Sequence, residues 1–180
     1  MDQPLTLDLI KREIAAWVNN YLDVPSDYYS GSKPCPFAAM AMKLEKVEIF
    51  LLDDPEQLAD KYVEFAQSSA HLFVCAFSEP WADLEEVVQK MNIEAARDNV
   101  WAAAMEPGCV GPDDPCLDPN KWGQETGQAY PIVLIQSLSE TASACECLRR
   151  QGYYDNLPTH FQEYVKERQD LNARRKENNG

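Results

Sequence analysis

The first part of the chain carries an apolar stripe with helical spacing. Apolar side chains recur at steps of three or four residues, which places them on one face of a helix: Ile10, Ile14, Trp17, Val18 and Tyr21. Thr6 or Asp8 is expected to cap this helix, and Pro25 to end it. A second, short helix is predicted to begin at Pro36, because proline suits the first helical position.

Four short apolar segments predict β-strands. They occupy residues 47–52, 71–77, 100–105 and 130–136. The second segment is apolar almost without interruption, which is typical of a strand buried on both faces. The third could equally extend the helix before it. The fourth contains Pro131, which favours the first position of a strand or a sheet edge.

Helical patterns separate the first three strands. After the first strand, Leu58, Tyr62 and Phe65 are spaced to face the core. After the second strand, a helix is predicted to open between Ser78 and Ala82, with an apolar stripe of its own.

Two helices are predicted after the last strand. Ser139 or Thr141 caps the first of them, which runs to Arg150. The second runs from residue 161 to about residue 176, and the residues after it are expected to fray.

This order of elements predicts an α/β fold. We expect a single domain with a four-stranded mixed sheet built from β-α-β units, an N-terminal helix and a C-terminal helical pair. The β-α-β units imply parallel neighbouring strands, whereas the last strand follows a loop and is expected to pair antiparallel. The domain is placed at residues 1–160, including a long loop at 106–129, and the C-terminal helix with its tail at 161–180.

The composition agrees with a folded domain. The chain has 180 residues, of which 45% are hydrophobic and 26% charged, close to the average for globular proteins. These values exclude a wholly disordered chain. No apolar run approaches the roughly 20 residues of a membrane-spanning helix, so we expect no association with a membrane.

The charge is strongly acidic and unevenly distributed. The chain has 30 Asp and Glu against 16 Lys and Arg, a net charge of −14. Residues 1–110 hold 19 acids and 8 bases, and residues 111–180 hold 11 acids and 8 bases. An acidic protein is repelled by phosphate backbones, which argues against direct nucleic-acid binding. The charge instead predicts a protein partner with a basic surface that meets the N-terminal two-thirds.

The N-terminus has no basic stretch followed by an apolar core, so we expect no secretory signal and a cytoplasmic location. Thiols stay reduced in that compartment. The cysteines are dispersed through a chain with enough apolar residues to fold without crosslinks, which argues against a disulfide framework. They are Cys35, Cys75, Cys109, Cys116, Cys145 and Cys147.

Cys35 is the best single candidate for catalysis. It precedes Pro36 and therefore falls at or beside the cap of a short helix. The helix N-terminus lowers the pKa of a thiol there, and Lys33 acts in the same direction. The alternative is a buried small hydrophobe that anchors the loop beside Phe37, since free cysteines are among the most buried residues.

Three features follow one another along the chain: Trp17 in the first helix, the segment 34–38 (Pro-Cys-Pro-Phe-Ala), and Tyr130 with Pro131 at a strand start. Together they resemble a family of short bacterial proteins of unknown function. That family has a Trp-bearing first helix, a Leu-Cys-Pro-Phe-Ala segment and a late Pro-Tyr-Pro strand with a helix behind it. Its loop before the late strand is rich in Asp and Asn, as this chain is at Asp113, Asp114, Asp118 and Asn120.

The chain departs from this family at its histidines. Leu134 and Ile135 stand where a histidine is expected, and Glu106 precedes Pro107 in place of a His-Pro pair. The resemblance therefore implies a fold rather than a histidine-dependent activity.

Other chemistry lacks the necessary motifs. The cysteine spacings do not match structural zinc sites, and His71 and His160 are the only imidazoles. The chain has no Gly-x-Ser-x-Gly elbow and no glycine-rich phosphate loop. We therefore predict no metal site and no cofactor.

The loop at 106–129 is the second candidate site. It carries four of the 12 prolines and four of the 7 glycines, and loops of this length are often functional. Exposed aromatic residues in loops are common partner anchors. The candidate binding residues are Trp122, Asp113, Asp114 and Tyr130. Alternatively, Trp122 folds back over the edge of the sheet.

Three functions remain open at this point. The leading hypothesis is a small acidic accessory protein that binds another protein, because no catalytic constellation is complete. The second is a thiol-dependent enzyme or redox protein with Cys35 as the nucleophile. The third is an acidic mimic of nucleic acid that inhibits a DNA-binding protein, which requires a regular stripe of carboxylates.

Overall fold

The computed structural model describes residues 4–106, 122–123, 125–126 and 129–179, apart from the side chains of His160 and Asn179. The elements follow one another in this order: α1 (Leu7–Trp17), the π-helical turn η1 (Val18–Leu22), the 3-10 turn η2 (Asp27–Tyr29), α2 (Pro36–Lys43), β1 (Val47–Leu52), α3 (Gln57–Gln67), β2 (Leu72–Phe77), α4 (Leu84–Ala95), the 3-10 turn η3 (Ala96–Asp98), β3 (Val100–Met105), β4 (Ile132–Ser137), α5 (Leu138–Arg150) and α6 (Thr159–Asn179).

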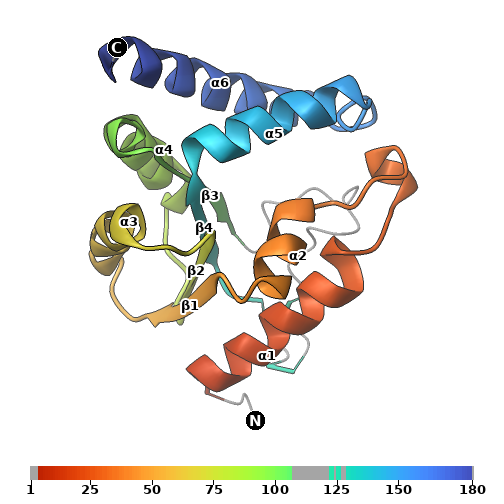
Figure 1. The fold of residues 1–180 in the computed structure, drawn as a ribbon. Coiled ribbons are helices and arrows are strands. Elements are labelled where there is room, and N and C mark those ends of the chain that lie inside the picture. The colour runs from red at the N-terminus through yellow and green to blue at the C-terminus, as the bar shows by residue number, and fades with distance from the viewer. Residues whose placement is uncertain (1–3, 107–121, 124, 127–128, 180) are drawn as a thin grey trace.

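The sheet forms the central layer of the molecule (Figure 1). Helices α3 and α4 cover one face, whereas α1, α2 and α5 lie on the other. Helix α6 packs on α5 beside the β3 edge. The predicted α/β fold with a four-stranded mixed sheet is therefore confirmed.

The strand order is β1-β2-β4-β3. β1 and β2 are parallel neighbours, as expected, and β4 pairs antiparallel with both β2 and β3. β2 and β3 are thus parallel but separated by β4, so the expectation of parallel neighbours is wrong for this β-α-β unit. A central place suits β4, because its residues from Ile132 to Gln136 are all buried.

Each strand divides its side chains between two cores, because successive residues point to opposite faces. In β2, Leu72, Val74 and Ala76 join the core beneath α1 and α2. Phe73, Cys75 and Phe77 of the same strand join the core beneath α3 and α4. The expectation that this strand is buried on both faces is confirmed.

The helix boundaries follow local hydrogen bonds. The Thr6 hydroxyl oxygen accepts from the Leu9 N–H at 3.3 Å and caps α1. Ser137, rather than Ser139 or Thr141, caps α5, because β4 runs directly into the helix. Its hydroxyl oxygen accepts from the Glu140 N–H at 3.3 Å. The predicted cap at Ser139 or Thr141 is wrong by at least two residues.

The predicted strand at residues 100–105 is confirmed, and the alternative of an extended helix is wrong, because Asn99 has a left-handed backbone (φ +64°) that ends the helix. One further boundary differs from the sequence-based expectation. α6 begins at Thr159, two residues earlier than expected, and stays helical to Asn179. Leu171 in this helix joins a small apolar cluster with Trp101, which holds α6 against the body.

Candidate functional site

Cys35 lies at the N-cap of α2, as its place before Pro36 predicts. The Cys35 N–H donates to the Leu22 carbonyl at 3.4 Å. The Pro34 carbonyl accepts a hydrogen bond from the Tyr153 hydroxyl, at the far end of the sequence. Cys35 is thus held between η1 and the turn that joins α5 to α6.

The environment of Cys35 opposes thiolate formation. Burial raises the pKa of the Cys35 thiol, and it outweighs the backbone N–H groups of Ala38 and Phe37, which lower it. Lys33 was also expected to lower the pKa of Cys35, but it instead forms an ion pair with Asp23 at 2.6 Å. A neutral thiol is a poor nucleophile, so these contacts favour the alternative of a structural cysteine, which is half-buried here.

Three residues near Cys35 were not anticipated from the sequence. Cys145 on α5 lies beside Tyr154 in the following turn, and both Arg168 and Cys35 are close enough to influence the pKa of Tyr154. Burial raises that pKa, and Cys145 raises it further. The raised pKa values of Cys35 and Tyr154 favour the protonated thiol and the protonated phenol at neutral pH, which are hydrogen-bond donors and poor nucleophiles. No sequence signal links these positions, because they lie more than 100 residues from Cys35.

This environment predicts the order in which the described cysteines react with iodoacetamide at pH 7. Cys147 is exposed and should be alkylated first, whereas Cys35 and Cys145 should react far more slowly. Cys75 should be slowest, because burial raises its pKa to about 12. Mass spectrometry of native and urea-unfolded protein measures the rates, with the unfolded protein as the control. Faster labelling of Cys35 than of Cys147 would support the nucleophile hypothesis instead.

The second predicted site is organised around Trp122. This residue is fully buried, and its ring packs on Trp17 with the centroids 5.1 Å apart. Its indole N–H donates to the Tyr130 carbonyl at 3.0 Å. Trp122 therefore folds back onto the protein and is not an exposed anchor. Asp113 and Asp114 lie outside the described residues.

Tyr130 is also buried, beside the carboxylate of Glu13. Burial raises the pKa of Tyr130, and the Glu13 carboxylate raises it further. Glu13 is buried as well, and its Oε1 accepts from the N–H groups of Glu125 and Thr126 at 2.7 and 2.8 Å. The contacts of Glu13 and Tyr130 thus hold the segment before β4 against α1, so both residues have a structural role.

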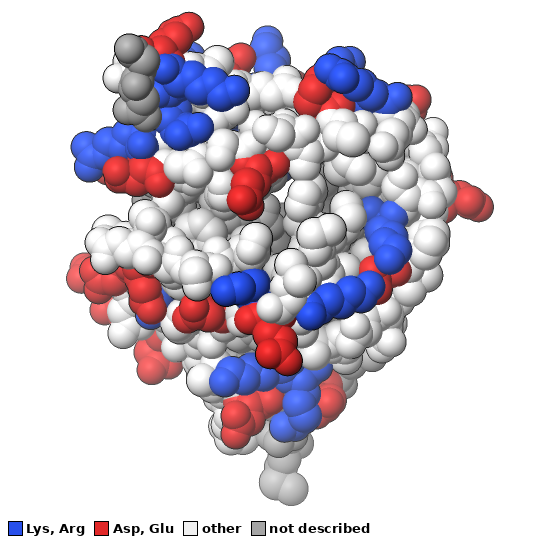
Figure 2. Space-filling model, in the orientation of Figure 1, with Lys and Arg blue, Asp and Glu red and all other residues white. Residues whose placement is uncertain are grey.

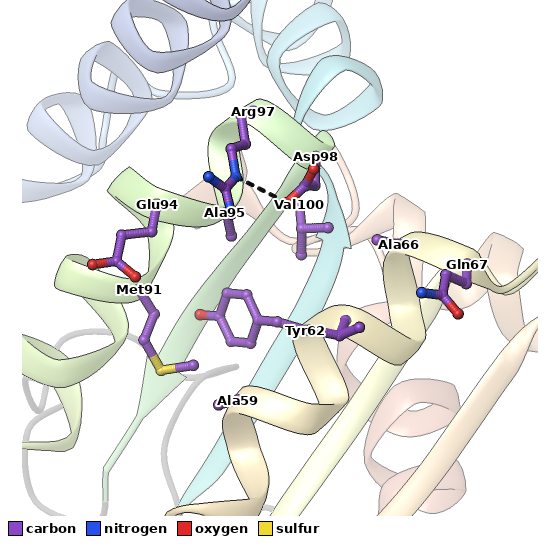
Figure 3. A pocket seen from close by; sticks show the side chains of 11 residues that line it. Ala59, Tyr62, Ala66, Gln67, Met91, Glu94, Ala95, Arg97, Asp98 and Val100 are labelled. Carbon is purple, nitrogen blue, oxygen red and sulfur yellow. Dashed lines mark hydrogen bonds and ion pairs between the residues drawn. The ribbon is translucent and has the colours of Figure 1, made fainter.

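A groove lies between α3 and α4, on the face of the sheet that these two helices cover (Figure 3). It encloses about 510 Å³. The Tyr62 ring points from α3 across it towards α4. Most of the residues that line it are apolar, among them Ala59, Tyr62, Val63, Met91 and Val100, and the polar or charged ones are Gln67, Glu94, Arg97 and Asp98.

The floor of this groove is rigidly held. The Tyr62 hydroxyl donates to Asn92 Oδ1 at 3.2 Å. The Asn92 side chain in turn pairs with the backbone of Ala102 in β3, donating from Nδ2 to its carbonyl and accepting from its N–H, both at 2.8 Å. Because every partner is buried, α3, α4 and β3 are joined beneath the groove.

The groove continues into a smaller, polar hollow of about 290 Å³. Ala66, Asp98 and Val100 line both. His71 Nδ1 and Glu140 Oε2 lie 3.8 Å apart in the hollow, and both side chains are substantially exposed. This end offers charged and polar contacts rather than a catalytic arrangement.

This groove was not predicted from the sequence. The apolar spacing of α3 correctly buries Tyr62 against the core, but Val63 lies off that stripe and is 60% exposed. An apolar, β-branched residue on the polar side of a helix was the available signal. Met91 of α4 is half-buried at the wall of the groove.

The described residues offer neither a metal centre nor a membrane span. Within the described ranges, no three His, Cys, Asp or Glu side chains converge on one point. No helix there is long and apolar enough to cross a membrane. Comparison of the chain with known protein families, with curated proteins and with solved structures finds no match, so no relative assigns a function.

Proposed function

We propose that the protein is a small acidic interaction protein of the cytoplasm, whose groove between α3 and α4 binds a basic, amphipathic segment of a partner protein. The observation that carries this proposal is the exposed apolar side chain of Val63 beside an open, largely apolar groove. Concave apolar surfaces with a polar end are where proteins bind partner helices and ligands.

The charge around the groove supports a basic partner. The segment that contains α3, β2, α4 and η3, residues 56–98, has 9 acids and 3 bases. Each of its bases already has an acidic neighbour: Lys61 with Glu64, Lys90 with Glu86, and Arg97 with Asp98. The excess negative charge is thus left to attract an incoming segment and to speed its association.

The other two hypotheses have less support. The thiol-dependent enzyme needs an ionised Cys35, and burial opposes that. The nucleic-acid mimic needs an unbroken run of carboxylates. On the face shown in Figure 2, Asp and Glu alternate with Lys and Arg, and basic residues gather over the C-terminal end of α6.

A photo-crosslinking amino acid at position 63 tests the proposal in the native cell. Val24 is the matched control, because it is the same residue type, is 46% exposed and lies in the loop that follows η1, away from the groove. We expect position 63, but not position 24, to capture one partner through a segment rich in Lys and Arg, which mass spectrometry identifies.

Binding of that segment should then depend on the groove and on salt. Val63→Lys places a cation among the apolar contacts and should weaken binding at least about tenfold, whereas Val24→Lys should leave it unchanged. Affinity should also fall as the salt concentration rises. Capture of an acidic segment, or equal capture from both positions, would contradict the proposal.

A further inference from the structure

The two edges of the sheet differ in how their backbone groups are used. At the β3 edge, the N–H and the carbonyl of Ala102 are both paired by the side chain of Asn92. α4 thereby pairs with the middle of this edge. At the β1 edge, no hydrogen bond from the described part of the chain reaches the outer side of the strand. Unpaired edges of this kind are templates for another strand.

The outward groups of β1 can be named. The Lys46 carbonyl points towards β2, because it accepts from the Leu72 N–H at 3.2 Å. Backbone groups of successive residues in a strand point in opposite directions. The N–H and carbonyl groups of Val47, Ile49 and Leu51 therefore point away from the sheet.

The side chains around this edge form two different surfaces. Val47, Ile49 and Leu51 are half-buried and pack against the core beneath α1 and α2. Glu48 and Phe50 project to the opposite face, on the α3 side, and Glu48 is exposed. An added strand would thus meet apolar side chains on one face and a carboxylate on the other.

The charge decides which strand fits. The stretch from residue 45 to residue 54 contains four acids, Glu45, Glu48, Asp53 and Asp54, and a single base, Lys46. A second copy of this chain would bring the same acids to the same edge, and each copy carries a net charge of −14. Both facts oppose self-pairing and favour a basic segment.

We propose that the β1 edge binds an extended basic segment of a partner protein as a fifth strand. The segment pairs through the outward backbone groups of Val47, Ile49 and Leu51. It alternates apolar side chains on the α1 face with Lys or Arg beside Glu48. This site differs from the groove between α3 and α4, which takes up side chains rather than backbone, and it stands whether or not the groove has a partner.

A capped seven-residue peptide, Lys-Val-Lys-Val-Lys-Val-Lys, serves as the probe. Hydrogen exchange resolved by residue should slow at least about tenfold at the amides of Val47, Ile49 and Leu51 when the peptide is added. The amides of Glu48 and Phe50 already point towards β2 and should not change. Equal slowing at both sets, or at groove residues only, would overturn the proposal.

Two altered peptides separate backbone pairing from charge attraction on the unaltered protein. N-methylation of every amide leaves the charge intact but removes the N–H donors from both edges of the peptide, and should abolish the protection. Replacement of every Lys by Glu preserves strand pairing but reverses the charge, and should weaken binding at least about tenfold. Unchanged binding of either peptide would overturn the proposal.

Two protein variants complete the test. Ile49→Pro removes one outward N–H while the bonds to β2 remain, and should weaken binding about fivefold or more. Glu48→Lys should reverse the preference, so that this variant binds the Glu-containing peptide more tightly than the Lys-containing one. Because Glu48 is exposed, the Glu48→Lys variant should fold even if Ile49→Pro does not. Light scattering measures whether the free protein forms a dimer. A dimer that dissociates in the Ile49→Pro variant would show that the β1 edge binds a second copy of this chain, and it would overturn the proposal.

Discussion

Replacing Trp122 by alanine is expected to destabilise the protein by about 4 kcal/mol, the largest loss that we expect from a single substitution. The side chain is fully buried and packs on Trp17. Its removal leaves a cavity, and large-to-small changes of aromatic residues cost about 3–5 kcal/mol. It also leaves the Tyr130 carbonyl without the indole N–H that it accepts at 3.0 Å. Urea denaturation followed by circular dichroism measures the change.

The conservative variant Trp122→Phe is the control. It keeps an aromatic ring against Trp17 but has no N–H for the Tyr130 carbonyl, so the expected loss is smaller, about 1–2 kcal/mol. A change of under about 1 kcal/mol for Trp122→Ala would mean that the ring contributes little to the folded state. That result would support the earlier hypothesis that Trp122 is an anchor for a binding partner.

Replacing Asn92 by alanine is expected to cost about 3 kcal/mol. The substitution leaves the N–H and the carbonyl of Ala102 unpaired, and it removes the acceptor for the Tyr62 hydroxyl. Buried polar groups without partners cost about 1–3 kcal/mol each, part of which water entering the space recovers. Denaturation measures the loss, and hydrogen exchange at the Ala102 amide reports whether the β3 edge has opened.

Asn92→Asp has nearly the same shape and tests the hydrogen bonds alone. An ionised carboxylate still accepts from the Ala102 N–H but faces the Ala102 carbonyl without a proton to donate. Burial and this carbonyl both favour the neutral acid, so the carboxyl introduced there should have a raised pKa in the folded state. A raised pKa stabilises the fold at low pH, and this contribution is lost as the pH rises through the folded-state pKa. Equal stability of Asn92→Asp and wild type at neutral pH would contradict the assigned role of Asn92.

The elements of the fold could be predicted because their signals are local. The apolar runs at 47–52 and 100–105 coincide with β1 and β3, and Pro36 marks the start of α2. The order of the strands was less accessible. No local sequence signal near β4 predicts that this strand inserts between β2 and β3. Its central position follows from the burial of both its faces in the assembled sheet.

The candidate sites show the same division. The position of Cys35 at a helix N-terminus was predicted from Pro36, but the direction of its pKa shift was not. That direction depends on burial beneath the turn that carries Tyr153 and Tyr154, far away in the sequence. Trp122 was open to two interpretations for the same reason, since its burial depends on Trp17.

The amino-acid sequence alone determined most of the helices and strands, the class of fold, the net charge of −14 and the lack of a complete catalytic motif. These properties depend on residue type and on spacings within one element. Only the tertiary structure decided that the pKa of Cys35 is raised, that a groove opens between α3 and α4, and that α4 pairs with Ala102 at the β3 edge, whereas the β1 edge has no such partner among the described residues. Each of these depends on distant segments meeting, because burial and hydrogen-bond pairing are set by whichever residues the fold brings together.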